Sequence, residues 1–410
     1  MHIQCTNGSP MVNTLDHLPL LPLFVHYLYS NRYAQGYTPT VMKKDELGIY
    51  DTLRLHGRIR HIELSLPPSI LHKALALMDG NFPILDHLSL SGLFSGDSGR
   101  RLPLTLPKAF LAPNLHHLTL IDVGLPKILW VLTSIVFLVT LTLRDIQTSS
   151  YLRPRLLVDY LQSLPLLEEL TIAFSIPIPR PGTENALLGE EGGPITLPSL
   201  KTLQFHGVGA YLESLVAQIR VPLLEKLHIG LFHQFTFVLP HLFYLINNTK
   251  VFKLSSARVS FRHDEVFVST AHDYGLGRTG FTLYVMCKPL DLQIDCAIQI
   301  CHALVPTLSD VKELWLHLSY KQPTERPNGA IDSATWRHLL RAFIGVKRLD
   351  IHNTLSEKLS RALQGDGVGS DPSFLPNLQS IHSRHNLFIS FIANRQVVGR
   401  PVQFQVAQWL

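Results

Sequence analysis

The sequence has few charged residues and few cysteines, and each shortage excludes a class of protein. Charged residues make up 16% of the 410 positions, below the roughly 25% typical of soluble domains, whereas hydrophobic residues make up 46%. This composition excludes a disordered or charge-dominated chain. The four cysteines, Cys5, Cys287, Cys296 and Cys301, are too few for a disulfide framework, so we expect free thiols in a reducing compartment.

Neither an export signal nor a run of apolar residues long enough to span a membrane is recognisable in the sequence. Residues 1–5 show neither the basic nor the apolar region of a signal peptide. The segment Ile128–Leu143 is uncharged over 16 residues, whereas a spanning helix needs about 20. We expect it to form a buried helix that runs into a buried strand. These features predict an intracellular protein, cytoplasmic or nuclear, without a membrane partner.

Charge of one sign is not concentrated anywhere in the chain. The net charge is +5, from 36 Lys and Arg against 31 Asp and Glu, and no run of five like charges occurs. This balance is compatible with anionic partners but disfavours nucleic acid as the main one. A chain of 410 residues exceeds the size of a single core, about 250–300 residues, so we expect several domains or an elongated repeat array.

Leucine is the residue in excess, with 73 copies, and it recurs in a pattern. The unit is φ-x-x-φ-x-φ after a loop residue or proline, where φ is usually Leu. Clear copies occupy residues 82–90, 112–120, 164–172, 197–205 and 221–229, and weaker ones centre on Ile62, Leu141, Leu254, Leu283, Leu314, Leu349 and Ile381. The eleven steps between centres 62 and 381 average 29 residues, at the upper edge of the leucine-rich-repeat period of about 20–29.

Each repeat also has room for a helix, and several contain apolar residues at helical spacing. Such stretches lie near residues 70–78, 156–161 and 339–343. The sequence therefore predicts an α/β fold, an irregular leucine-rich-repeat solenoid (horseshoe) with parallel β-strands on the concave face and helices on the convex face. We expect residues 1–56 to form an N-terminal cap and residues 57–410 about twelve repeat units. Loops are expected at 176–194, 321–333 and 364–373.

Motifs that carry catalytic or metal chemistry are weak. Residues 275–280 match G-x-G-x-x-G, but strand-like runs flank them on both sides, which favours a hairpin turn over a dinucleotide site. The group Cys296, Cys301 and His302 lacks zinc-ligand spacing, so buried thiols are the better interpretation. We expect no enzymatic activity, no cofactor and no metal site.

Strand alternation predicts a polar face opposite the core, because residues between the φ positions point away from it. Eight of the 21 histidines fall on that face. The candidate partner-binding residues are His117, Arg144, Gln204, His206, His228, Trp315, His317, Arg348 and His352. One hypothesis is a recognition surface with pH-dependent binding between about pH 5.5 and 7.5. The alternative is a solvated face that only keeps the sheet soluble.

Several stretches resemble a known family when their order and spacing are taken together. They are residues 5–10, 17–23, 58–64, 82–88, 222–227, 336–341 and 399–402. With them, nearly the whole chain resembles the large F-box/leucine-rich-repeat-like family of mushroom-forming fungi. The resemblance implies a non-enzymatic protein-recognition module, the substrate-binding part of an F-box ubiquitin-ligase receptor.

The F-box itself is not recognisable in this sequence. Leu18–Val25 echoes the Leu-Pro opening of an F-box, but Pro22 would break its first helix. We therefore expect the ligase adaptor subunit to be a partner only if an F-box exists upstream; the protein partner itself is unknown. A stand-alone leucine-rich-repeat scaffold without a ligase link and a weakly basic nucleic-acid-binding solenoid remain alternatives.

Overall fold

The chain forms two compact α/β units, each with a mostly parallel set of strands and helices packed on them. Unit 1 comprises Met1–Gly207 and Ala217–Leu223, and unit 2 comprises Val208–Val216 and Leu224–Leu410. The computed structural model describes residues 2–4, 21–28, 41, 43–92, 106–122, 132, 134–146, 151–177, 193–232, 237–270, 279–319, 332–364 and 374–406. The three predicted loops, Cys5 and most of the helical half of Ile128–Leu143 lie largely outside these residues.

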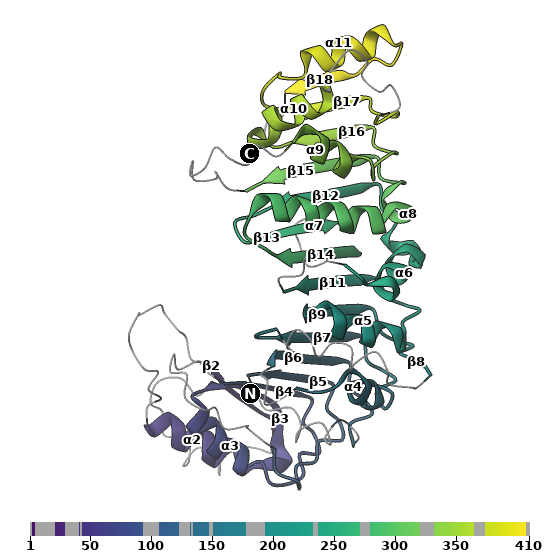
Figure 1. The fold of residues 1–410 in the computed structure, drawn as a ribbon. Coiled ribbons are helices and arrows are strands. Elements are labelled where there is room, and N and C mark those ends of the chain that lie inside the picture. Colours follow the sequence, from purple (N-terminus) through teal and green to yellow (C-terminus); the bar gives the residue numbers. More distant parts are fainter. Residues whose placement is uncertain are drawn as a thin grey trace. The chain divides into compact units, whose positions relative to one another are not determined.

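Unit 1 has parallel strands that neighbour one another in chain order (Figure 1). They are β1 (His2–Gln4), β2 (Leu23–Leu28), β3 (Ile59–Leu66), β4 (His87–Gly92), β5 (His117–Ile121), β6 (Thr140–Ile146), β7 (Glu169–Phe174) and β9 (Thr202–Gly207). The predicted repeat centres form one continuous cross-strand row and are all fully buried: Ile62, Leu88, Leu118, Leu141, Leu170 and Leu203. The predicted register is therefore confirmed in this unit.

Helices of unit 1 bury one apolar side against the strands. They are α2 (Lys43–Leu53), the 3-10 turn η1 (His56–Arg58), α3 (Pro68–Ala76) and α4 (Pro154–Leu161), and a short parallel pair joins β8 (Ile195–Thr196) to β10 (Ile219–Arg220). Proline at the start of α3 and α4 suits the first helical turn, where its missing N–H has no partner to lose. Both predicted helices are thus present. Strand β2, inside the segment predicted as a cap, pairs with β3.

Unit 2 departs from the predicted simple order of strands. Its strands are β11 (Lys226–Leu231), β12 (Ser256–Phe261), β13 (Glu265–Ser269), β14 (Gly280–Met286), β15 (Glu313–Leu318), β16 (Arg348–Ile351), β17 (Ser380–Ser383) and β18 (Gln403–Val406). They lie in the order β11-β14-β13-β12-β15-β16-β17-β18, and β13 is antiparallel to both neighbours. The expectation of parallel strands in every repeat is therefore wrong here.

Strand β13 runs antiparallel to β12 because the connection between them is short. Only Arg262–Asp264 separate β12 from β13, and a parallel crossover needs a dozen or more residues. The glycine-rich motif connects β13 to β14, which pair antiparallel, as expected for a hairpin, although residues 271–278 lie outside the described part. Two register predictions fail as a result. Leu254 is half-buried outside any strand, and Leu227 neighbours Phe281 of β14 instead of the next predicted centre, Leu254.

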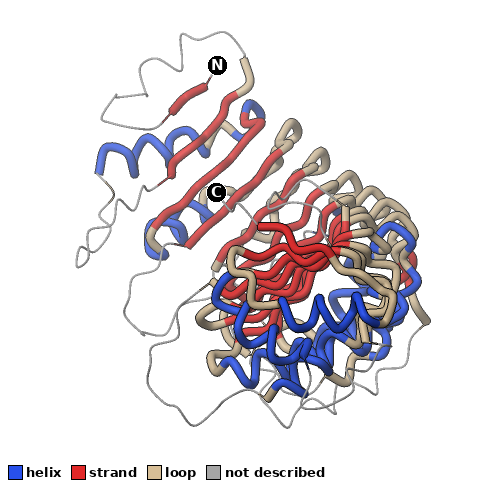
Figure 2. The backbone as a smooth tube through the Cα atoms, turned by 90° about the horizontal axis from the view of Figure 1, so that it is seen from above, coloured by secondary structure: helices blue, strands red, loops and turns tan. Residues whose placement is uncertain are grey.

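Helices of unit 2 lie along one side of its strands, drawn in blue beside the red strands in Figure 2. They are α5 (Gly209–Ala217), α6 (Pro240–Asn248), η5 (Lys250–Phe252), α7 (Leu290–Ala303), α8 (Val305–Leu308), α9 (Ser333–Leu340), η6 (Asn353–Leu355), α10 (Ser356–Gln364) and α11 (Ile389–Val397). Trp336 of α9 is fully buried and packs edge-on against Phe261 of β12, with ring centroids 5.6 Å apart. The helices therefore cover the core side and leave the opposite strand face to polar residues.

Cys287, Cys296 and Cys301 are buried thiols that form no disulfide, as predicted, and burial raises the pKa of the Cys301 thiol. Among the residues that the structure describes, no helix has the length and apolar character that crossing a membrane requires.

Candidate binding face

The polar strand face of unit 2 is organised around Trp315. Leu314 and Leu316 are buried beneath it, whereas Trp315 is half-buried on the opposite side of β15, so the predicted orientation is confirmed. Arg258 of β12 is its direct cross-strand neighbour, and its guanidinium carbon lies 5.1 Å from the Trp315 ring centroid. This cation–π contact holds a flat aromatic surface and a positive charge together at the middle of the face.

Next to Trp315, an ion pair occupies β16. Arg348 donates from Nε and Nη2 to the two carboxylate oxygens of Asp350, at 2.8 and 3.0 Å. Asp350 is only 2% exposed and is the cross-strand neighbour of both Trp315 and His382. Nδ1 of His382 lies 3.8 Å from Oδ1 of Asp350. The hydrogen bonds to Asp350 raise the pKa of Arg348. The carboxylate is thus already neutralised within the chain.

Imidazoles complete this part of the face. Nδ1 of His317 lies 3.2 Å from Ser260 Oγ and 3.1 Å from Ser319 Oγ, and its ring meets that of His352 edge-on at 4.5 Å. Burial, reinforced by the positive groups of His352, Arg258 and Arg262, lowers the pKa of His317 to about 4. Burial also lowers the pKa of His352. Both pKa values therefore lie below the unperturbed value on which the predicted binding window of about pH 5.5–7.5 was based.

The remaining predicted residue of unit 2 lies on another strand. His228 is exposed on β11, with its ring centroid 5.3 Å from that of Tyr284 on β14. In the strand order, β13 and β12 separate β14 from β15. His228 is therefore on the polar face but belongs to a different part of it from Trp315.

Unit 1 carries a row of histidines on the corresponding face. His61, His87 and His117 are cross-strand neighbours on β3, β4 and β5, with ring centroids 4.2 and 5.7 Å apart. Nδ1 of His117 lies 3.1 Å from Thr140 Oγ1 on β6. Burial, followed by the neighbouring imidazoles, lowers the pKa of His87 to about 4, and burial is the main cause that lowers the pKa of His61.

A second row of unit 1 is mostly hydroxyl-bearing. It contains His26, Glu63, Ser89, Thr119, Thr142, Thr171 and Gln204, each in register with the next. Arg144 is exposed and His206 half-buried further along β6 and β9. The four predicted residues of this unit, His117, Arg144, Gln204 and His206, thus point to the polar face, as expected, but are spread along it.

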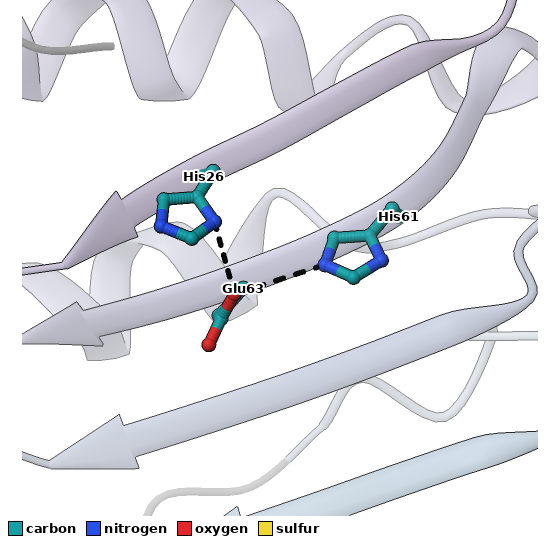
Figure 3. Close-up of side chains that lie close together, drawn as sticks. All are labelled: His26, His61 and Glu63. Carbon is teal, nitrogen blue, oxygen red and sulfur yellow. Dashed lines mark ion pairs between the residues drawn. The ribbon is translucent and has the colours of Figure 1, made fainter. Parts of the chain in front are cut away.

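The two rows meet at β2 and β3 in a group that sequence reasoning missed. His26, His61 and Glu63 offer ligand atoms that all lie within 4.8 Å of one another (Figure 3). The signal for this group is the alternation of buried Leu23, Val25 and Tyr27 in β2. It was missed because residues 1–56 are predicted as a cap without repeat strands.

Arg258 was missed for a related reason. It sits between the buried residues Ala257, Val259 and Phe261, which alternate as a half-buried strand should. Placing the repeat centre at Leu254 assigned Lys253 to the polar face instead, whereas Lys253 lies outside any strand. The same alternation rule, applied three residues later with Ala257 as the repeat centre, would have found Arg258.

Together these groups form two arrays suited to stacking and hydrogen bonding. Neither protein-family models nor curated proteins give a match for this sequence, so function has to be argued from these arrays.

Proposed function

We propose that the chain is a non-enzymatic protein-recognition module, an irregular leucine-rich-repeat solenoid that binds its partner through the polar strand face. The observation that carries this proposal is the Trp315–Arg258 pair on unit 2, flanked by the imidazoles of His317 and His352. Trp and Arg are the residues most often found as energetic anchors of protein interfaces.

The surroundings of Trp315 support binding to a protein surface. The charge of Asp350 is already paired with Arg348, so covering it requires little additional desolvation. His317, with a pKa of about 4, is neutral near pH 7 and can donate and accept hydrogen bonds without the cost of burying a charge. A partner that covers Trp315 would therefore meet an aromatic surface rimmed by neutral polar groups.

The resemblance to F-box/leucine-rich-repeat-like proteins supports a more specific role. By this proposal the chain is the substrate-binding part of a ubiquitin-ligase receptor, and its partner is a protein destined for modification. Recovery of the ligase adaptor subunit with the tagged chain from its native cells favours this role. Stoichiometric recovery of another protein alone favours the stand-alone scaffold when the genomic sequence encodes no in-frame F-box upstream.

The test is a quantitative affinity pull-down with mass spectrometry, comparing wild type with Trp315→Ala. We expect the recovered partner to bind at least about 1 kcal/mol more weakly, roughly fivefold, while the melting temperature stays unchanged. Tyr244→Ala is the matched control, because Tyr244 is 71% exposed on helix α6 of the same unit. Equal recovery by all three proteins contradicts the proposal, as does partner recovery that nuclease abolishes.

A further inference from the structure

The group His26, His61 and Glu63 lies on two adjacent parallel strands of unit 1. His26 on β2 is the direct neighbour of Glu63 on β3, and Phe24 is the neighbour of His61. His61 and Glu63 are two residues apart on one strand and so point to the same face. All three side chains therefore project from the polar face above a fully buried layer that includes Val25 and Ile62.

A local irregularity brings His26 to Glu63. The register of β2 against β3 shifts by one residue between Leu23, opposite Ile59, and Phe24, opposite His61. Without this shift His26 would stand opposite Ile62, a core residue, and Glu63 would have no histidine beside it on β2. Bulges of this kind re-aim side chains and are over-represented near functional sites.

The donor atoms converge on one point. Glu63 Oε2 lies 2.9 Å from His26 Nδ1 and 3.8 Å from His61 Nε2, as Figure 3 shows. In a tetrahedral zinc site with metal–ligand distances of about 2.0–2.2 Å, neighbouring donors stand about 3.3 Å apart. The two separations lie on either side of this value, so small side-chain rotations would let all three donors reach one ion.

Neighbouring rings hold the imidazole of His61 in place. The ring of His61 stacks on Phe24 at 5.9 Å and on His87 at 4.2 Å, with an interplanar angle of 9° in the second pair. The side chains of His26, Glu63 and His61 keep 33%, 31% and 26% exposure, so solvent reaches the group. A bound ion would have three protein ligands and at least one position open to water, as zinc sites that bind a further ligand do.

The chemistry of the donors selects the class of ion. Two imidazole nitrogens and one carboxylate suit zinc and similar first-row divalent ions, whereas calcium and magnesium prefer sites built from oxygens alone. We propose that His26, His61 and Glu63 form a binding site for a divalent transition-metal ion, zinc foremost, with an open coordination position on the polar face. This site belongs to unit 1, whereas Trp315 belongs to unit 2, and the inference does not depend on the proposed recognition function.

The test is calorimetric titration of the metal-stripped full-length chain with zinc alone. We expect one saturable site with a dissociation constant below about 10 μM. Glu63→Gln keeps a hydrogen-bond acceptor for His26 but removes the negative charge, and His26→Ala removes one donor. Each should weaken zinc binding at least tenfold without changing the melting temperature of the zinc-free protein. Cobalt should give the absorption bands of tetrahedral coordination in wild type only.

The matched control is His241→Ala. His241 Nδ1 lies 2.6 Å from Glu213 Oε1, so it forms a similar imidazole–carboxylate pair, but it belongs to no three-donor group among the described residues. Its substitution should leave zinc affinity unchanged. Absence of a saturable site below about 100 μM in wild type overturns the proposal. Unchanged affinity in both Glu63→Gln and His26→Ala overturns it equally, since zinc would then bind elsewhere.

Discussion

Unit 1 and unit 2 build similar polar faces on differently connected strands. In unit 1 the strands follow chain order and all run parallel, whereas in unit 2 the hairpin of β13 and β14 reverses the order between β11 and β15. The faces differ too. Unit 1 presents rows of imidazoles and hydroxyls, and unit 2 presents an aromatic ring with paired charges.

The difference shows what a repeat pattern specifies. Apolar alternation fixes which side of each strand is buried, in both units alike. The identity of the neighbouring strand depends instead on the connection, because a short link forces an antiparallel pairing and a long one permits a parallel crossover. In unit 1 each strand neighbours the next one in the chain, because each long connection leads to the next parallel strand.

The largest expected effect tests the corrected register. Leu203→Ala in unit 1 and Leu227→Ala in unit 2 should each lower the free energy of unfolding by about 2–5 kcal/mol, because both side chains are buried at 2% exposure or less. Leu254→Ala, at the repeat centre that the structure corrects, should cost at most about 1 kcal/mol. Urea denaturation measures all three. If Leu254→Ala lowered the free energy of unfolding as much as the other two, Leu254 would be a buried repeat centre, as the sequence predicts, and unit 2 would follow the same register as unit 1.

A smaller effect is expected from close packing at Gly345 in unit 2. A Cβ there would collide with the backbone carbonyl oxygen of Ser309 and lie 3.0 Å from that of Val311. Gly345→Ala should therefore cost about 1–3 kcal/mol. Gly48→Ala in helix α2 of unit 1 meets nothing within 4 Å and should stabilise by about 0.5–1 kcal/mol. If Gly345→Ala left the melting temperature unchanged, residue 345 could not lie this close to the backbone of Ser309 and Val311.

The smallest expected effect concerns pH and His317. Its pKa is about 4 when folded and about 6.5 when unfolded, so between these values only the unfolded chain binds the proton. Stability should fall as pH drops from about 6.5 to 4, by on the order of 1 kcal/mol given partial solvent exposure. His317→Gln should remove this component from the pH profile of unfolding. If wild type and His317→Gln showed the same dependence of unfolding free energy on pH, the folded-state pKa of His317 would not be lowered by burial as described.

Much of unit 1 could be predicted because its signals are local. The six buried centres from Ile62 to Leu203 lie in one row, as the φ-x-x-φ-x-φ spacing predicts. Asp122, directly after β5, and Asp145, within β6, take positive φ, a backbone conformation in which Asp is enriched. Helices α3 and α4 follow from their i, i+4 apolar spacing.

The candidate sites were harder to predict because they depend on pairing between strands. The alternation that places Trp315 outward lies within one strand, and its orientation was correctly predicted. Arg258 reaches Trp315 only because β12 pairs with β15, although 57 residues separate them in sequence. His26 reaches Glu63 only through a one-residue register shift. Neither pairing leaves a periodic signal in the sequence.

The most direct test of recognition through the polar face is chemical footprinting of the chain with its recovered partner bound. Binding should suppress carbethoxylation of His317 and His352 and oxidation of Trp315. His302 and His338, exposed on helices α7 and α9 of the same unit, should react as in the free chain. Protection of His302 and His338 with full reactivity at Trp315, His317 and His352 would place the partner on the helices and contradict this account.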